Sequence, residues 1–446
     1  MAEELGEIQI EVGQLEIGMY VARLDRPWEE TDFLIQGFLI TSPDEIDALT
    51  EQCEFVYIES RSELGSAPIA KDDRRHRKTG LAERHTTKSA QGSATTKSRS
   101  TKYSHGDTPV QLTAKSTKTV SYINKIPVEQ EFAQARLCYK YAKLTSKSIM
   151  DSIRIGRVID VNECRDVVDD IVDSILRNNN ALTWLTKMKN KDDYTAEHSL
   201  NVCILSVMFA RHLGLQESEI RTIGLCGLLH DIGKAKIPLE ILNKPGRFTD
   251  EELEVMKQHS TFGRDLLMTI SDTPTAAIDV AYCHHERLDQ QGYPRGLQQH
   301  QIPYYAKLIS ITDTYDAITS SRVYDNARSS MVALDIIYKN RGRQFDEELA
   351  LEFIKCIGVY PPGAIVEMTN GEVAIVIASN KDNKLKPRIM KVLNAEKQSV
   401  QHTIINLADN TDDSEGDPYR IKNEVANGTY GLDIKEFLKR GLKLRK

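Results

Sequence analysis

Residues 284 to 294 read HHERLDQQGYP, placing two histidines, a glutamate and an aspartate within six positions ahead of a Gly-Tyr-Pro turn. Such a run is typical either of a metal site or of a polar corner. Apolar residues recur with helical spacing on both sides of it, from about residue 128 to residue 356. The stretch therefore belongs to a helical domain, in which other helices could bring further ligands to the two histidines.

The periodicity predicts helices at residues 132–150, 161–176, 195–212, 218–229, 249–269, 276–286, 306–320, 330–339 and 346–356. The clearest start is Thr249-Asp-Glu-Glu252, because a Ser/Thr-x-x-Glu box satisfies backbone amides that lack partners inside the helix. Together these segments predict a helical domain over residues 126–360.

Both flanks of this domain show the alternation of strands. Residues 1–65 predict a small α+β domain, with strands near 8–12, 18–21, 33–35, 38–40 and 55–58 and a helix at 43–52. Residues 361–446 predict a C-terminal extension, with strands at 364–368 and 373–377 joined by an Asn370-Gly371 hairpin, a third strand at 388–392 and a last helix at 433–442. The expected fold is mainly α, with these two smaller β-containing parts.

Residues 66–125 lose all hydrophobic periodicity and hold 13 Lys and Arg against four Asp and Glu. We interpret this segment as a basic, solvated linker; contact with an acidic face, RNA or anionic lipid is the alternative.

The bulk properties narrow the class of protein. The net charge of -7 over 446 residues argues against a chain-wide nucleic-acid-binding surface. The seven cysteines are scattered without a CxxC pair, so we expect reduced, buried thiols. No apolar run approaches the roughly 18 residues of a membrane span, and the start lacks the pattern of a signal peptide. A cytoplasmic protein is expected.

Five histidines and two aspartates of the helical domain form a pattern with metal-binding chemistry: His198, His230, Asp231, His259, His284, His285 and Asp313. A carboxylate in an apolar helix, such as Asp313, is costly to bury unless it is paired. Adjacent helical residues point about 100° apart, so adjacent ligand pairs require separate partners or a site with two metals. Imidazole with carboxylate suits Fe, Mn, Zn or Co.

Two such metals predict hydrolysis of a phosphate ester. Asp231 is the natural bridging carboxylate, and a hydroxide bridging both metals would attack phosphorus. Lys234, one helical turn beyond His230, could contact the same phosphate.

Four motifs then identify a family. HDIGK at 230–234, NKPGRFTDEE at 243–252, HHERLDQQGYP at 284–294 and DTYDAITSSRVY at 313–324 resemble the HD-GYP family, HD-domain phosphohydrolases that cleave cyclic di-GMP. The resemblance covers about residues 180–360 and implies an HD-domain helical bundle. The flanking regions also resemble one HD-GYP subgroup, whose N-terminal domain has no settled function.

The resemblance implies a role for each matching residue. One metal would be held by His198, His230, Asp231 and Asp313, and the other by Asp231, His259, His284 and His285, with Fe or Mn as the expected ions. Asp289 would orient a ligand imidazole, and Glu286 would be hydrogen-bonded behind the site. The expected substrate contacts are Asp192, Lys234, Tyr293 and Arg322, and the catalytic residues are Asp231 and Lys234.

The chain also departs from the family pattern. Gln290 stands where the family has glycine, which costs about 1 kcal/mol if that position has φ > 0. Val323 stands where the family commonly has proline, and Asp325 stands where a basic residue often helps to hold phosphate. Tyr194 stands where members with three metals have a glutamate, and Glu197 lies on the wrong helix face, so two metals are expected.

Three functions stay open from the sequence. The first is a cyclic di-GMP phosphodiesterase that releases pGpG and perhaps GMP. The second is a slow or inactive cyclic di-GMP sensor or scaffold, acting through a partner such as a diguanylate cyclase. The third is hydrolysis of another cyclic dinucleotide, such as the mixed GMP-AMP species. The N-terminal module is expected to serve in docking or in homodimer formation.

Overall fold

The computed structural model describes residues 7–17, 19–26, 28, 31, 33, 38–40, 42–59, 119–157, 159–187, 194–320, 328–380, 383–409, 412–413, 416–434 and 437. Most of the basic linker lies outside these residues, as do Asp192, Arg322, Val323 and Asp325.

The N-terminal part is a four-stranded antiparallel sheet with one helix. Its strands are β1 (Glu7–Glu11), β2 (Tyr20–Leu24), β3 (Phe38–Leu39) and β4 (Phe55–Glu59), in the order β1-β4-β2-β3. Helix α1 (Pro43–Gln52) has the predicted bounds and begins with a capping box between Ser42 and Glu45. The strand predicted at 33–35 falls largely outside the described residues.

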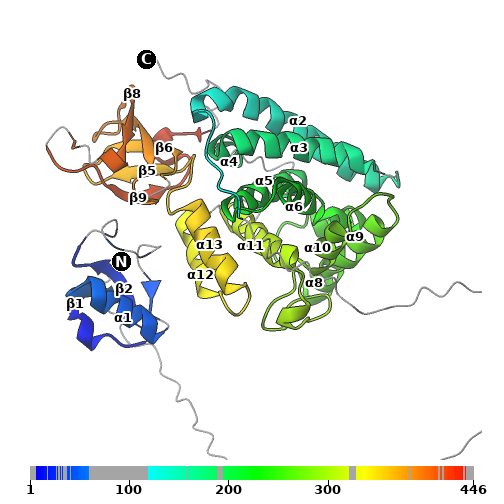
Figure 1. Ribbon diagram of the computed structural model, residues 1–446, viewed down its shortest axis with the longest axis horizontal. Helices are drawn as coiled ribbons and strands as arrows, with labels where there is room; N and C mark the ends of the chain where they lie inside the picture. The colour runs from blue at the N-terminus through cyan, green and yellow to red at the C-terminus, as the bar shows by residue number, and fades with distance from the viewer. Residues whose placement is uncertain are drawn as a thin grey trace, which may run out of the picture.

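The central part is helical, as predicted (Figure 1). Its longer helices are α2 (Val128–Arg154), α3 (Val161–Arg177), α5 (Tyr194–His212), α6 (Glu217–Leu229), α10 (Thr275–Cys283), α11 (Tyr304–Thr319), α12 (Ser330–Lys339) and α13 (Glu347–Ile357). Two short helices were not predicted, α4 (Asn179–Leu185) and α7 (Leu239–Leu242). Residues of α5, including Leu200, Cys203 and Ile204, are completely buried and form the middle of the core.

The single helix predicted at 249–269 is wrong, because the chain forms α8 (Asp250–Lys257) and α9 (His259–Met268), separated at Gln258. His259 therefore begins a helix. At this break, Nδ1 of His259 lies 2.7 Å from the carbonyl oxygen of Met256, so a backbone acceptor of α8 orients the imidazole.

The C-terminal part is a five-stranded antiparallel sheet in the order β8-β7-β6-β5-β9. The predicted strands are β5 (Ile365–Met368), β6 (Val373–Ala378) and β7 (Arg388–Leu393), whereas β8 (Ser399–Asn406) and β9 (Ile421–Val425) were missed. Gly371 in the predicted hairpin has φ 82°, as the Asn-Gly signal indicates. Most of the helix predicted at 433–442 lies outside the described residues.

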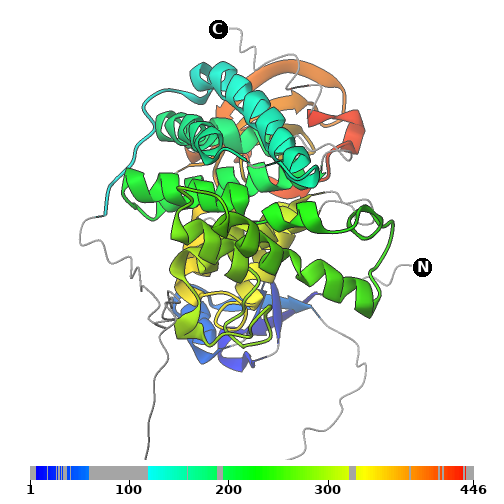
Figure 2. The ribbon, with the colours of Figure 1, turned by 90° about the vertical axis from the view of Figure 1, so that its right-hand side faces the viewer.

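This sheet packs against the first helices of the central part (Figure 2). Trp184 Nε1 donates a hydrogen bond of 2.8 Å to the carbonyl oxygen of Ile377, and the Arg388 guanidinium lies 2.6 Å from Glu129. All seven cysteines are free and buried, as expected. None of the described helices combines the length and apolar character that crossing a membrane requires.

Candidate metal centre

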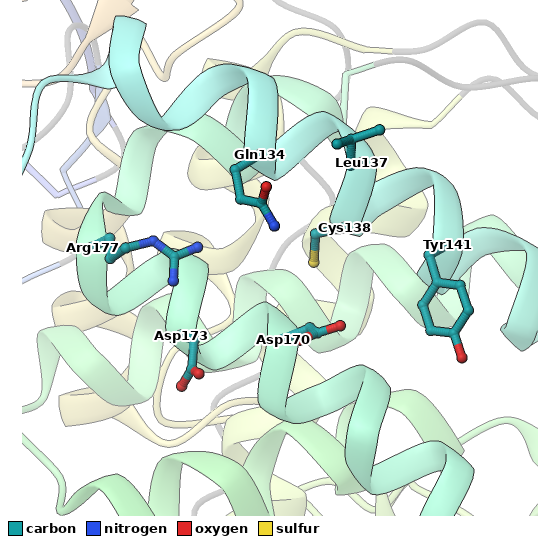
Figure 3. Close-up of a pocket in the computed structure, with 7 residues that line it drawn as sticks. All are labelled: Gln134, Leu137, Cys138, Tyr141, Asp170, Asp173 and Arg177. Carbon is teal, nitrogen blue, oxygen red and sulfur yellow. The ribbon is translucent and has the colours of Figure 1, made fainter.

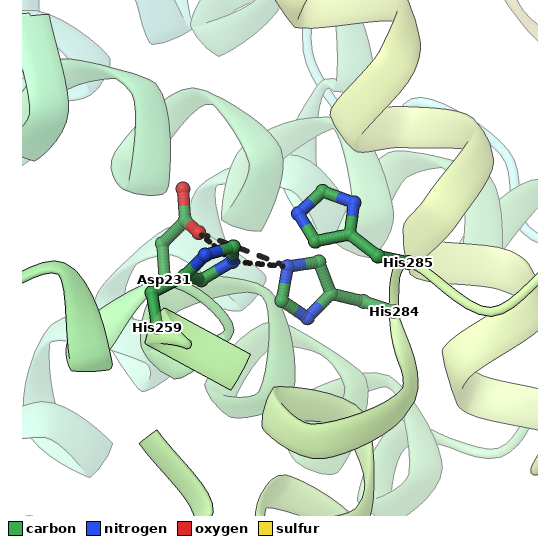
Figure 4. Close-up of side chains that lie close together, drawn as sticks. All are labelled: Asp231, His259, His284 and His285. Carbon is green, nitrogen blue, oxygen red and sulfur yellow. Dashed lines mark hydrogen bonds and ion pairs between the residues drawn. The ribbon is translucent and has the colours of Figure 1, made fainter. Parts of the chain in front are cut away.

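The predicted metal ligands converge in two groups, formed by Asp231, His259, His284 and His285 and by His198, His230 and Asp313. Within each group the ligand atoms lie within 4.8 Å of one another. They come from α5, the end of α6, the start of α9, the end of α10 and α11. Figure 4 shows how the side chains of the first group gather.

Asp231 lies between the two groups and gives one oxygen to each. Its Oδ1 is 3.3 Å from Nε2 of His259 and 3.7 Å from Nε2 of His284. Its Oδ2 is 3.3 Å from Nε2 of His230 and 3.6 Å from Nε2 of His198. The carboxylate therefore has the position of a bridge.

Backbone carbonyls fix the orientation of three imidazoles. The Nδ1 atoms of His230, His259 and His284 lie 2.7, 2.7 and 3.0 Å from carbonyl oxygens three or four residues earlier. A carbonyl only accepts, so each Nδ1 carries the hydrogen and each Nε2 presents its lone pair toward Asp231. This tautomer is the one that a metal ligand needs.

Two buried atoms support a fit with metal. Among the described residues, His230 Nε2 and Asp231 Oδ1 have no hydrogen-bond partner, although His230 and Asp231 are only 0% and 1% exposed. Buried polar atoms are almost always satisfied, and an imidazole nitrogen beside a carboxylate oxygen matches the donor set of a divalent transition metal. The cluster could hold metal.

The electrostatics keep the aspartates ionised. Burial by itself raises the pKa of Asp231, but Lys234 and His230 bring that pKa well below its usual range. Burial likewise opposes ionisation of Asp313, whose pKa is lowered chiefly by its hydrogen bond with His198. Both carboxylates are therefore negative at neutral pH.

Two of the imidazoles are kept neutral. Burial lowers the pKa of His259 to about 3, and it lowers that of His285 well below 6.5, with His284 adding to the effect. Burial also lowers the pKa of His198, but hydrogen bonds with Asp313 and Asp316 raise it to about 9. A cation between His198 and Asp313 would compete with that proton.

The predicted substrate residues that the structure describes lie at the rim of the cluster. Lys234, in the 3-10 turn η3 (Ile232–Lys236), places Nζ 2.5 Å from Asp231 Oδ2. The Tyr293 ring stacks on His285 at a centroid distance of 4.6 Å. Glu286, which was expected behind the site and not among the substrate residues, accepts hydrogen bonds from the backbone amides of Arg295 and Leu297 at 2.8 and 2.9 Å.

The expectation for Asp289 needs correction. Its carboxylate accepts from the Arg287 guanidinium at 2.9 and 2.7 Å, and within the described chain it contacts no ligand imidazole. Arg287 is only two residues away and always charged, so it pairs with the Asp289 carboxylate in preference to an imidazole. Asp316 instead approaches an imidazole, with Oδ2 2.8 Å from Nδ1 of His198. The spacing of Asp313 and Asp316, one helical turn apart on α11, was the signal that could have revealed it.

Glu197 belongs to neither of the two described groups of candidate ligands. It is buried and pairs with Lys143 of α2.

Backbone geometry explains three residues of the motifs. Gln290 has φ 61°, the left-handed conformation anticipated from the family's glycine. At Gly292 an added Cβ would lie 2.4 Å from the Arg287 backbone nitrogen, so no side chain fits there. At Gly233 an added Cβ would lie 1.9 Å from the His259 carbonyl oxygen, so this glycine permits the close approach of η3 and α9.

A separate hollow of about 250 Å³ lies between α2 and α3, lined by Gln134, Leu137, Cys138, Tyr141, Asp170, Asp173 and Arg177 (Figure 3). It shares no residue with the histidine cluster.

Comparison with known proteins places these features in a family. The HD-domain profile matches residues 174–349, and that of a domain of unknown function, DUF3391, matches residues 7–164. The chain is 37% identical over 284 residues to a cyclic di-GMP phosphodiesterase of Pseudomonas aeruginosa, covering 64% of this chain and 68% of that protein.

Two further relatives match shorter segments. A cyclic di-GMP phosphodiesterase response regulator of Xanthomonas campestris is 42% identical over 143 residues, which are 31% of this chain and 37% of that protein. A 3′3′-cGAMP-specific phosphodiesterase of Vibrio cholerae is 37% identical over 147 residues, which are 33% of this chain and 34% of that protein. From the HD-domain match across the cluster and the alignment with 68% of the Pseudomonas protein, the chain belongs to the HD-GYP branch of the HD-domain family, with a DUF3391 domain on its N-terminal side.

Proposed function

We propose that this protein is a metal-dependent phosphodiesterase that hydrolyses cyclic di-GMP to the linear dinucleotide pGpG. The observation that carries the proposal is the position of Asp231, whose two oxygens face two separate sets of imidazoles. The names of the Pseudomonas and Xanthomonas relatives support cyclic di-GMP as the substrate.

In this proposal the cluster holds two divalent ions, Fe or Mn. His198, His230, Asp231 and Asp313 would hold one, and Asp231, His259, His284 and His285 the other. Bound ions would supply an acidified water and stabilise negative charge on a phosphate.

The chain's own side chains would place the substrate. Lys234, held beside Asp231, offers an ammonium group to a non-bridging phosphate oxygen. Tyr293 offers an aromatic face at the rim, beside His285. Asp192 and Arg322 are proposed to complete the nucleotide site.

The proposal extends to the organisation of the chain. Residues 1–65, 66–125, 126–360 and 361–446 would be the N-terminal domain, linker, catalytic domain and C-terminal extension. A diguanylate cyclase or a second copy of this chain is the proposed protein partner. The sensor or scaffold alternative is not favoured, because the relatives carry the names of phosphodiesterases.

The test is hydrolysis of cyclic di-GMP by anaerobically purified protein supplied with Fe(II) or Mn(II), with metal content measured. Asp231→Asn should abolish linear product and reduce bound metal, whereas Asp265→Asn, at an exposed position of α9, should match the wild type. The mixed GMP-AMP dinucleotide is assayed in parallel, because the Vibrio relative is named for it. Metal-loaded wild type that cleaves neither dinucleotide would contradict the proposal.

A further inference from the structure

The N-terminal domain is joined to the central helices through a buried carboxylate. Glu45 of α1 is 9% exposed, and its Oε1 accepts from the Tyr338 hydroxyl at 2.6 Å and from the Arg341 guanidinium at 3.1 Å. Its Oε2 accepts from the Ser42 amide at 3.1 Å and so completes the capping box of α1. One carboxylate thus fixes the start of α1 and binds the end of α12.

Tyr338 and Arg341, the two partners of Glu45, also contact each other. The Arg341 guanidinium lies 3.7 Å from the centroid of the Tyr338 ring and donates to the Tyr338 carbonyl oxygen at 2.9 Å. With side-chain exposures of 16% for Arg341 and 11% for Glu45, the ion pair is largely shielded from water. Arg341 Nε also lies 3.6 Å from Oε1 of the exposed Glu347, so removing Glu45 would leave the largely buried guanidinium with a weaker, solvated partner.

Arg341 is the second residue of a compact turn between α12 and α13, residues 340–346, which we name the α12–α13 turn. The Gly342 amide donates to the Phe345 carbonyl oxygen at 2.8 Å, and the Gln344 amide donates to that of Asn340 at 2.9 Å. Phe345 is 1% exposed and anchors the turn in the core. A displacement of Arg341 would therefore be transmitted along the turn.

The opposite side of this turn contacts the loop that carries the cluster histidines. The Asp289 amide donates to the Arg343 carbonyl oxygen at 2.8 Å, and the Arg287 guanidinium donates to Gln344 Oε1 at 3.1 Å. Arg287 and Asp289 lie in residues 284–297, which we name the histidine loop.

The histidine loop sets the position of Tyr293. The Tyr293 amide donates to the His285 carbonyl oxygen at 3.2 Å, and the two rings stack. The Gln291 amide donates to Asp289 Oδ1 at 3.2 Å. A continuous set of contacts therefore runs from Glu45 through the α12–α13 turn to the proposed substrate residue.

We infer that the N-terminal domain positions the active site, with Glu45 acting through Arg341 and the α12–α13 turn to hold the histidine loop and Tyr293. Glu45 is a positioning residue that supports substrate binding without touching the cluster. The expected change in KM rests on the proposed function. The expected change in amide exchange rests on the contacts alone.

The test compares full-length Glu45→Gln with Glu51→Gln, a change at an exposed position of the same helix. Amide hydrogen exchange over the α12–α13 turn and the histidine loop should accelerate in Glu45→Gln and stay unchanged in Glu51→Gln. The KM for cyclic di-GMP should rise about 3- to 30-fold, with kcat within about twofold and metal content unaltered. Tyr338→Phe, which removes one hydroxyl, should show a smaller change in the same direction. This variant keeps the inference testable if Glu45→Gln folds poorly.

Faster exchange confined to α1 in Glu45→Gln, with a wild-type KM, would overturn the inference. The exchange measurement needs no turnover, so an inactive wild type would refute the proposed function and leave the positioning contact to be judged by exchange alone.

Discussion

Nδ1 of His198 lies 2.8 Å from Oδ2 of Asp316, and both side chains are buried. Asp316 is also held by Ser320 Oγ at 3.0 Å. Carboxylates behind a metal-binding imidazole typically contribute 10- to 100-fold in metal affinity. We therefore expect Asp316→Asn to weaken binding of Mn(II) by about 10- to 100-fold, as measured by titration. Asp289→Asn is the matched comparison and should bind Mn(II) like the wild type. Equal losses in both variants would contradict this assignment.

Gly233→Ala should disturb α9, because the new Cβ would lie 1.9 Å from the His259 carbonyl oxygen. We expect a loss of about 1–3 kcal/mol in the free energy of unfolding, together with reduced metal content. Gly263→Ala is the control, since its Cβ would meet Ala281 at 3.4 Å, an ordinary contact. Urea unfolding and metal analysis test this prediction. A Gly233→Ala variant with wild-type stability and metal content would show that η3 and α9 can separate enough to admit a methyl group.

Gln290→Gly should stabilise the protein by about 1 kcal/mol, because Gln290 has φ 61° and glycine adopts this conformation without strain. The same change at Gln291 should destabilise it, since that residue is not in the left-handed region. Thermal unfolding of the two variants provides the comparison. A Gln290→Gly variant less stable than the wild type would mean that the Gln290 side chain has contacts that outweigh its strain.

Stability should depend on pH through His212, whose Nε2 lies 3.1 Å from Glu352. Burial lowers its pKa below 6.5, against the opposing effect of Glu352. The folded state then binds fewer protons than the unfolded state, so unfolding free energy is lost as the pH falls through 6.5 toward the folded pKa. His212→Gln should therefore cost less stability at pH 5.5 than at pH 7.5 in urea unfolding. A larger loss of unfolding free energy at pH 5.5 than at pH 7.5 would mean that the pKa of His212 is raised in the folded state, and would contradict the prediction.

The sequence predicted the elements with clear periodicity and missed those without it. Helix α4 was missed because its seven residues make only about two turns, too few for a helical period to show, and six of them are buried whether polar or apolar. Strand β8 has one buried residue, Ile405, and so shows no alternation of buried and exposed positions. The break at Gln258 was missed because apolar residues continue on both sides of it.

The candidate site shows the same limit. The motifs were sufficient to name the residues that converge around Asp231, and their roles as metal ligands stay a prediction. The partners of Asp289 and Asp316 depend on tertiary contacts and on competition with neighbouring charges, which spacing along the chain does not reveal.

The hydrogen bond from Trp184 to Ile377 bears on the order in which the protein is made. A ribosome completes the last cluster residue, Asp313, before it reaches the strand that accepts from Trp184. At about 5–20 residues per second, the intervening stretch takes roughly 3 to 13 seconds to synthesise. A truncated product ending near residue 360 would contain every histidine of the cluster, yet it would leave the Trp184 indole without its acceptor and Glu129 without Arg388. Cellular proteases should therefore remove such nascent fragments, even though their catalytic motifs are intact.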